Sequence, residues 1–333
     1  MGSKTTTRAG RADGSAGRAR LRLRVAAALA LTCAAALAGA SSAGAAAPQP
    51  TVSTSNAKEV SFGSATLAGS VNPNGKDTSY YFQYGPTRAY GGQTAIADAG
   101  AGSHPVGVKL PVTGLQPLTV YHFRLVAVNA AGASIGGDSR FLTTKVPLSL
   151  AILASPNPVL FGGTATVQGT LSGTGNANRV VVLQANPFPY AGFQTTGNPE
   201  LTSATGGFSF PVLGLTTVTQ FRVATTTNPP VISPIAIEAV TVRVDSHVAR
   251  TGRRHFARIF GTVTPAEDGM QVAILRITHG HGVLVGGSIL HHRNATSSKF
   301  SRVVPVRSGI YRVLVRVTNG AQASNYGTPL LIR

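Results

Sequence analysis

Outside its first fifty residues, the chain consists of short stretches in which apolar and polar residues alternate, separated by Gly, Pro, Asn and Ser. The stretch VYHFRLVAV (120–128) places Tyr121 and Phe123 on one face and His122 and Arg124 on the other. A period of two residues is that of a β-strand with one buried face. Stretches with a helical period are absent, and only 12% of the residues are charged. The pattern therefore predicts an all-β protein.

The N-terminal segment has the pattern of a secretory signal peptide. Residues 1–24 are rich in Arg, and the apolar run VAAALALTCAAALAGA follows, with Ala-Gly-Ala at 38–40 and 43–45. A basic region, a short apolar region and small residues at the exit are typical of a cleaved signal. We therefore expect residues 1–46 to be a signal peptide and the protein to be secreted, extracellular or associated with the cell surface. A retained anchor or a lipid-modified Cys33 are the alternatives.

Cysteine and charge limit the chemistry of the mature chain. Cys33 is the only cysteine, so the mature chain can hold neither a disulfide nor a thiolate metal site. Residues 47–145 and 146–243 are nearly neutral, whereas residues 244–333 carry twelve Lys and Arg against three acids. A charge concentrated in one segment indicates the kind of partner rather than the fold.

One tyrosine has a structural explanation. Tyr121 begins the inward face of its strand, directly after the turn that contains Pro117. Its ring can pack in a core while its hydroxyl bonds to the backbone a few residues upstream, as in the tyrosine corner of immunoglobulin-like sandwiches. We therefore assign Tyr121 a structural role at this corner.

Residues 50–144 resemble a fibronectin type III domain of the kind found in secreted proteins of high-GC bacteria. The matching stretches are ATLAGSVNPNG (65–75), YYFQYGPTRAYG (80–91), GLQPLTVYHFRLVAVNAAG (114–132) and GGDSRFLTT (136–144). Leu67 stands where the family usually has an early tryptophan. The resemblance implies a β-sandwich with one missing core anchor.

The remaining two segments, 147–243 and 244–333, resemble each other. FGGTATVQGTL parallels RRHFARIFGTV, RVVVLQA parallels QVAILRI, and TQFRVATT parallels GIYRVLVRV, in the same order. Both segments look like bacterial immunoglobulin-like domains. The sequence thus predicts three tandem immunoglobulin-like β-sandwiches, the first of them fibronectin type III-like, after the signal peptide.

The sequence offers no catalytic constellation, and we expect a protein that is not an enzyme and uses no cofactor. The adjacent acids Glu267 and Asp268 lie in TPAEDG, a string typical of a solvated turn. GASIG (132–136) matches a nucleophile motif around Ser134, but that motif needs a following helix. Here the string is predicted to connect the last two strands of the first domain.

Histidines provide one candidate metal site. HGH (279–281) and HH (291–292) flank GVLVGGSIL, a string expected to form a hairpin. Such a hairpin would bring His279, His281, His291 and His292 together, and imidazole suits Zn²⁺ or Cu²⁺. The alternative is a solvated, weakly basic hairpin base.

Arginines provide a candidate polyanion site. Alternation in the last segment suggests one sheet face that presents Arg258, Arg276, Arg302, Arg307, Arg312 and Arg316. Arginine pairs well with phosphate, sulfate and carboxylate. The alternative is that these arginines are simply solvated cations. Nucleic acid is a poor candidate ligand because no aromatic platform accompanies the charge.

These features favour a non-catalytic exported protein that acts as an adhesion, spacer or surface-interaction module. Its expected partner is an anionic cell-wall polymer or polysaccharide, bound by the basic C-terminal domain, or another surface protein, with no membrane span in the mature chain. The alternative is a carbohydrate-binding accessory protein of extracellular polysaccharide degradation. Without Trp, sugar binding would depend on Tyr80, Tyr84, Tyr90, Phe188 and Tyr190.

Overall fold

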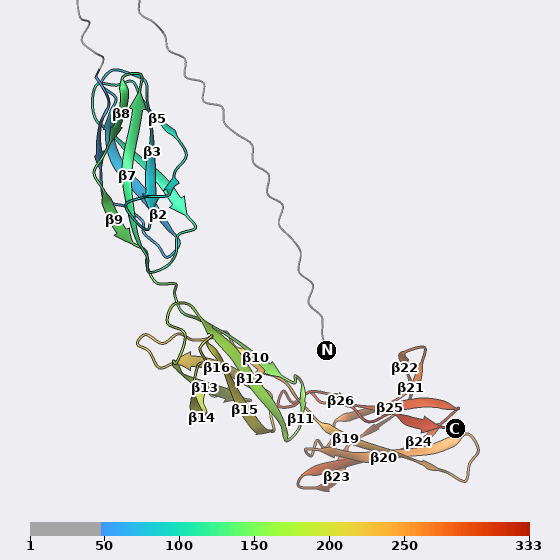
Figure 1. Cartoon of the computed structure of the whole chain (residues 1–333). Helices are drawn as coiled ribbons and strands as arrows, with labels where there is room; N and C mark the ends of the chain where they lie inside the picture. Colours follow the sequence, from blue (N-terminus) through green and yellow to red (C-terminus); the bar gives the residue numbers. More distant parts are fainter. Residues whose placement is uncertain (1–47) are drawn as a thin grey trace, which may run out of the picture. The chain divides into compact units, whose positions relative to one another are not determined.

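A computed structural model describes residues 48–333, and all regular elements in this range are β-strands (Figure 1). The predicted signal peptide, residues 1–46, lies outside the described residues. Between residues 48 and 333, no helix is long and apolar enough to cross a membrane. The strands surround three separate hydrophobic clusters, so the all-β class and the tandem β-sandwich architecture predicted from the sequence are confirmed.

The first sandwich consists of two facing sheets. One sheet has the order β1-β2-β6, and in the other β3 and β7 are central. Its strands are β1 (Thr51–Thr54), β2 (Ser64–Asn72), β3 (Thr78–Gly85), β4 (Gly92–Gln93), β5 (Ala97–Gly100), β6 (Val106–Thr113), β7 (Val120–Asn129), β8 (Gly132–Ile135) and β9 (Ser139–Leu142). The paired strands β3 and β7 run side by side in Figure 1, β2 belongs to the facing sheet, and alternate side chains of each enter the core.

Aromatic side chains fill the core between these sheets. Phe82 and Phe123 are fully buried, with ring centroids 6.2 Å apart. Leu67, which stands in place of the expected tryptophan, is also fully buried. The core therefore accommodates the smaller side chain with phenylalanines from the opposite sheet.

Tyr121 makes the contact of a tyrosine corner. The Gln116 N–H donates to the Tyr121 hydroxyl at 3.0 Å, and the Tyr121 ring stacks on Phe141 at a centroid distance of 5.7 Å. The hydroxyl thus satisfies a backbone donor in the turn that precedes β7, while the ring stays buried.

The second sandwich has the main sheets β10-β12-β15 and β14-β13-β16-β17, with a short parallel pair of β11 and β18. Its strands are β10 (Ser149–Ser155), β11 (Val159–Leu160), β12 (Gly163–Ser172), β13 (Val180–Pro187), β14 (Gln194–Leu201), β15 (Gly207–Leu215), β16 (Thr219–Thr225), β17 (Ala236–Glu238) and β18 (Val240–Thr241). All eight residues of the edge strand β14 are exposed.

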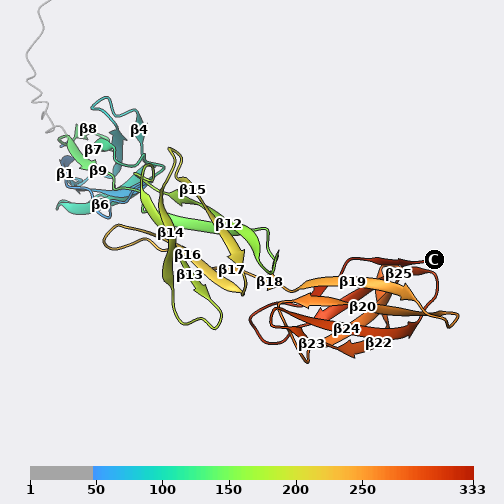
Figure 2. The same ribbon diagram turned by 90° about the horizontal axis from the view of Figure 1, so that it is seen from below.

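The third sandwich has the sheets β19-β20-β24-β23 and β22-β21-β25-β26, and β27 pairs with β25. The first of these sheets is labelled strand by strand in Figure 2. The strands are β19 (Arg243–Arg250), β20 (Phe256–Thr264), β21 (Gln271–Thr278), β22 (His281–Ile289), β23 (His291–Asn294), β24 (Ser297–Pro305), β25 (Gly309–Arg316), β26 (Asn325–Tyr326) and β27 (Leu330–Ile332).

The two repeats inferred from the sequence have the same strand pairing. β12 pairs with β15 as β20 pairs with β24, and β13 pairs with β16 as β21 pairs with β25. Tyr311 in β25 forms a second corner, in which its hydroxyl bonds to the N–H and the carbonyl of Arg307. The matching residue of the second sandwich is Phe221, which is fully buried and has no hydroxyl.

Two local predictions were wrong. GASIG was expected to be a connection, but Gly132–Ile135 forms the edge strand β8, in which Ser134 pairs with Ala127. Residues 282–290 were expected to form a hairpin, but residues 281–289 form the single strand β22. In both cases Gly lies within a strand rather than in a turn, which local composition does not reveal.

Replacing Tyr121 by Phe tests the first corner. The Y121F chain should lose about 1 kcal/mol of stability in the first sandwich, because the Gln116 N–H is left without its partner. Hydrogen–deuterium exchange resolved by segment should show faster exchange around residues 114–121. Y190F changes an exposed tyrosine and is the matched control. Equal exchange in Y121F and the parent chain would contradict a stabilising role for the hydroxyl.

Candidate anion-binding site

The six predicted arginines do not share one face, because their strands belong to two opposing sheets. Arg258 and Arg302 lie on β20 and β24, in one sheet, whereas Arg276, Arg312 and Arg316 lie on β21 and β25, in the other. Arg307 lies in the loop between β24 and β25. Alternation predicted which residues point outward, but it could not assign strands to sheets.

Two of these arginines interact with the sandwich itself. Arg276 donates from Nη2 to the Ser308 carbonyl at 3.1 Å, and the Arg312 guanidinium lies 4.7 Å from the centroid of the Tyr326 ring. The Nε atoms of both are buried without a hydrogen bond. These contacts restrict both side chains, which makes them poorer ligands for an external anion.

The outer face of the β19-β20-β24-β23 sheet carries a hollow of about 410 Å³ with several cations around an aromatic ring. The Arg258 guanidinium lies 4.7 Å from the centroid of the Phe260 ring, which orients it by a cation–π contact. Arg293 and Lys299 line the same hollow. Arg258 is thus the predicted residue that the fold places among other cations.

The acids of the third sandwich do not neutralise its arginines. Asp245 lies 3.2 Å from His247 Nε2, and Asp268 lies 3.1 Å from His292 Nδ1. In residues 48–333 the only ion pair that involves Arg or Lys is Arg88 with Asp138, in the first sandwich. The basic charge of the third sandwich is therefore not compensated internally.

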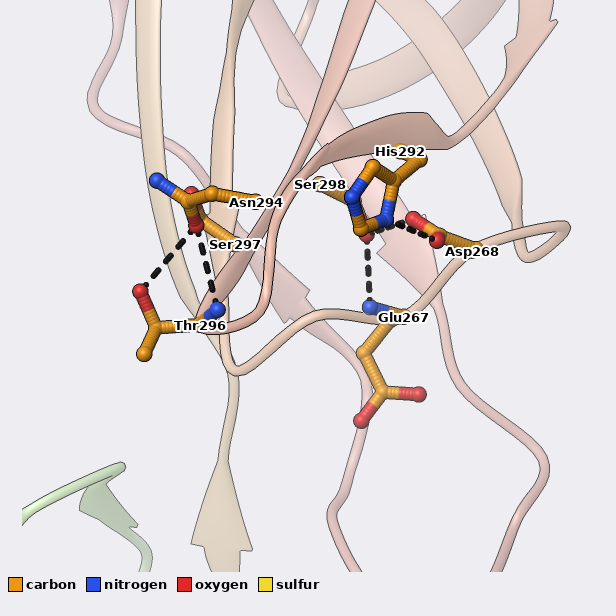
Figure 3. Close-up of polar contacts among 7 residues, drawn as sticks. All are labelled: Glu267, Asp268, His292, Asn294, Thr296, Ser297 and Ser298. Atoms are coloured by element: carbon orange, nitrogen blue, oxygen red, sulfur yellow. Dashed lines mark hydrogen bonds and ion pairs between the residues drawn. The ribbon is translucent and has the colours of Figure 1, made fainter.

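The expectation of a solvated turn holds for Asp268, which is exposed in a turn, but was wrong for Glu267 (Figure 3). Glu267 is buried, and the Asn319 amide donates to its two carboxylate oxygens at 3.1 and 2.9 Å. Burial raises the pKa of Glu267, and the Asn319 bonds oppose this shift. The Ser298 hydroxyl and His292 lower the pKa of Asp268.

The contacts of Ser298 exclude a serine nucleophile in this cluster. Ser298 is fully buried, its hydroxyl donates to Asp268, and it accepts from the Glu267 N–H at 2.7 Å (Figure 3). A catalytic serine transfers its proton to a neighbouring base such as histidine, but here the proton is directed to a carboxylate. The cluster instead fastens the turn before β21 to β24.

The four predicted metal-binding histidines are not brought together. His279 lies in the turn before β22, and His281 begins that strand. His291 and His292 lie in β23, which belongs to the other sheet. The nine residues of β22 separate the two pairs by roughly 30 Å along the strand. Across residues 48–333, no group of three or more His, Cys, Asp or Glu could hold a metal ion.

Sequence reasoning missed a polar network in the first sandwich. Asp138 accepts from the Tyr90 hydroxyl at 3.0 Å, and it lies 2.9 Å from His122 Nδ1 and 3.3 Å from Arg88 Nε. Desolvation raises the pKa of Asp138, but the hydrogen bonds from His122 and Tyr90 outweigh it and the pKa is lowered. Arg88 and Tyr90 come from the loop between β3 and β4, whereas His122 lies on β7, so no single local motif marks the partners. The partners of Asp138 include no nucleophile. The network connects loops of the first sandwich.

The aromatic residues proposed for sugar binding are only partly available. Tyr80 and Tyr90 are buried in the first sandwich, where they cannot form an exposed platform. Tyr190 is 40% exposed and lies edge-on to Phe188, with ring centroids 5.6 Å apart. The carbohydrate-binding alternative therefore lacks two of its five expected residues.

Comparisons with known proteins identify no family and find only distantly similar solved structures. No family model matches the chain, and no curated protein matches it. Among solved structures, similar ones are the FN1–FN3 domains of chicken CNTN1 (15% identity, 85% of this chain and 97% of that chain, TM-score 0.29) and domains A168–A170 of titin (15%, 85% and 98%, 0.34). A tetra-tandem repeat from the extending region of a large adhesion protein is also similar (15%, 84% and 74%, 0.28). At these identities and TM-scores the likeness carries no inference about this chain, and the β-sandwich fold rests on its own strand pairing and cores.

One buried carboxylate in the second sandwich has no compensating partner. Glu238 is fully buried, and neither of its carboxylate oxygens accepts a hydrogen bond. Burial raises its pKa to about 7. An acid whose pKa is raised by folding stabilises the fold at low pH, and that contribution is lost as the pH rises from the unfolded-state pKa through the folded-state pKa.

Replacing Glu238 by Gln should therefore flatten the pH dependence of stability in the second sandwich. Between pH 4.5 and about 8 the parent chain should lose up to roughly 3 kcal/mol relative to E238Q, because only the parent has to ionise a buried group. Urea unfolding at several pH values measures this difference. E200Q alters an exposed acid on β14 and is the control. Parallel pH profiles for E238Q and the parent would contradict the assignment.

Proposed function

We propose that this protein is an exported, non-catalytic module for adhesion, spacing or surface interaction. Its third sandwich binds an anionic cell-wall polymer or an acidic polysaccharide. Binding of this kind requires multiple cations rather than a catalytic pocket, and it tolerates polymers of variable length. Tandem β-sandwiches support the proposal because they provide stable scaffolds whose outward side chains are free to interact.

One observation carries the proposal: the positive charge of residues 244–333 outweighs the charge of its three acids, and these acids form no ion pair with its Arg or Lys. The segment has twelve Lys and Arg, and none of them forms an ion pair in the part of the chain that the structure describes. Its three acids are instead occupied by His247, by His292 and Ser298, and by Asn319. Unpaired surface cations attract an anionic polymer at no cost of breaking internal ion pairs.

The proposal predicts salt-sensitive retention that depends on the third sandwich. Residues 48–333 should bind an immobilised polyanion such as dextran sulfate at low ionic strength and elute as salt is raised, because exposed charges are screened within about 10 Å at 0.1 M. Binding measured by a column or pull-down assay should weaken by about tenfold or more when four cations of the third sandwich are changed to Ser. These four are Arg250, Arg258, Arg293 and Lys299.

The matched control removes the same charge from the first sandwich and the segment that follows it. Its four exposed lysines, changed to Ser, are Lys58, Lys76, Lys109 and Lys145. This variant should retain most of the binding. Equal losses in the two variants would mean that net charge alone, and not the third sandwich, causes binding. Retention that survives high salt would contradict an electrostatic mode altogether.

A further inference from the structure

One end of the third sandwich contains a hollow of about 670 Å³ that the sequence analysis did not foresee. Its lining includes Arg250 at the end of β19, Arg253 and Arg254 in the loop that follows, and Arg307 between β24 and β25. No Asp or Glu side chain lines it. Four guanidinium groups from two loops and a strand end thus surround one open space, which is also lined by Arg333, directly after β27.

These guanidinium groups are available to an external ligand. All four arginines are exposed, and none forms an ion pair with another residue in the range 48–333. Of these four arginines, only Arg307 is among the six that the sequence analysis predicted to bind a polyanion. The others follow one another in the loop sequence RTGRRH, where alternation gives no signal.

The loop that presents Arg253 and Arg254 is held by its own hydrogen bonds. The Thr251 hydroxyl lies 3.1 Å from the Arg253 carbonyl and 2.9 Å from the Phe256 carbonyl. The Val306 N–H donates to the His255 carbonyl at 2.8 Å and ties the loop to the opposite wall. The Arg253 guanidinium lies 4.2 Å from the centroid of the Phe256 ring. A loop fixed in this way loses less conformational entropy when a ligand binds.

The opposite wall is fixed by the second tyrosine corner. The Arg307 N–H donates to the Tyr311 hydroxyl at 2.9 Å, and that hydroxyl donates to the Arg307 carbonyl at 3.0 Å. The Tyr311 ring is in the core, only 1% exposed. The core side chain thus holds the Arg307 backbone in place while leaving its guanidinium free.

We propose that this hollow, which we call the arginine hollow (Arg250, Arg253, Arg254 and Arg307), binds the phosphate or sulfate groups of an anionic polymer. The inference rests on the proposed function and adds to it the binding site and the chemistry of the ligand. Phosphate and sulfate groups present several anionic oxygens on one tetrahedral centre, so guanidinium groups that approach from different directions can each donate to one of them. A planar carboxylate has only two oxygens, both of which one arginine can engage at once.

Charge-matched double variants of residues 48–333 test the assignment. The probes are long-chain polyphosphate, dextran sulfate and polygalacturonate, compared by calorimetry at one ionic strength. The double variant R253S/R254S should bind polyphosphate or dextran sulfate at least tenfold more weakly than the parent, since it loses two charge-assisted contacts. The control R302S/R316S removes the same charge from exposed positions outside the hollow and should lose threefold or less.

A second double variant keeps the test decisive if the first one fails to fold. If R253S/R254S fails to fold because the contact between Arg253 and Phe256 is lost, R250S/R307S removes two guanidinium groups from the other walls and should show the same tenfold loss. The comparison of polyphosphate with dextran sulfate tells whether phosphate or sulfate groups are preferred, and either result supports binding of a tetrahedral oxyanion.

The outcomes separate the two proposals. Equal weakening of the hollow variants and of R302S/R316S overturns the arginine hollow but leaves the proposed function in place. If polygalacturonate binds as tightly as polyphosphate and dextran sulfate, the assignment to tetrahedral oxyanions is overturned. A parent chain that binds none of the three polymers overturns both proposals. Tighter binding of single-stranded DNA than of polyphosphate overturns the assignment to an extracellular polymer.

Discussion

Packing of alternate side chains between two facing sheets is the interaction on which everything else in the described chain depends. The only cysteine, Cys33, precedes the described residues, so each sandwich is held by burial and hydrogen bonding alone. Phe82 and Phe123 in the first sandwich, and Phe221 in the second, are fully buried in their respective cores. Because one side chain in two is committed to a core, the other half is free to differ among the sandwiches, and the three differ mainly in that half.

The side chains that point away from the cores explain how charge is distributed. In the third sandwich the outward positions of both sheets carry arginine, and the loops at one end carry more of it, without acids to pair with it. Its few acids serve the fold instead: Glu267 is buried against Asn319, and Asp268 holds Ser298. Because these carboxylates form hydrogen bonds within the domain, its surface stays positive whatever the pairing of its strands.

Much of the fold could be predicted from the sequence because it depends on local patterns. Alternation located the strands, and a tyrosine after a turn such as that before Tyr121 indicated a sandwich corner. The site could not be predicted in the same way, because it depends on which strands become neighbours. Arg258 and Arg312 have the same outward pattern in the sequence, yet their strands lie in opposing sheets. His281 and His291 are close in sequence, but a nine-residue strand keeps them apart.

Tyr311 links two properties that are usually changed independently, the packing of the core and the position of the backbone that carries Arg307. Its ring belongs to the core cluster, and its oxygen sets the backbone that carries Arg307. The loop 251–255, in contrast, is tied to the sandwich by hydrogen bonds of its backbone and of Thr251, with no core side chain between Gly252 and His255. Substitutions in this loop can therefore change the chemistry of one wall of the hollow without altering a core side chain, whereas the other wall is inherited together with the core.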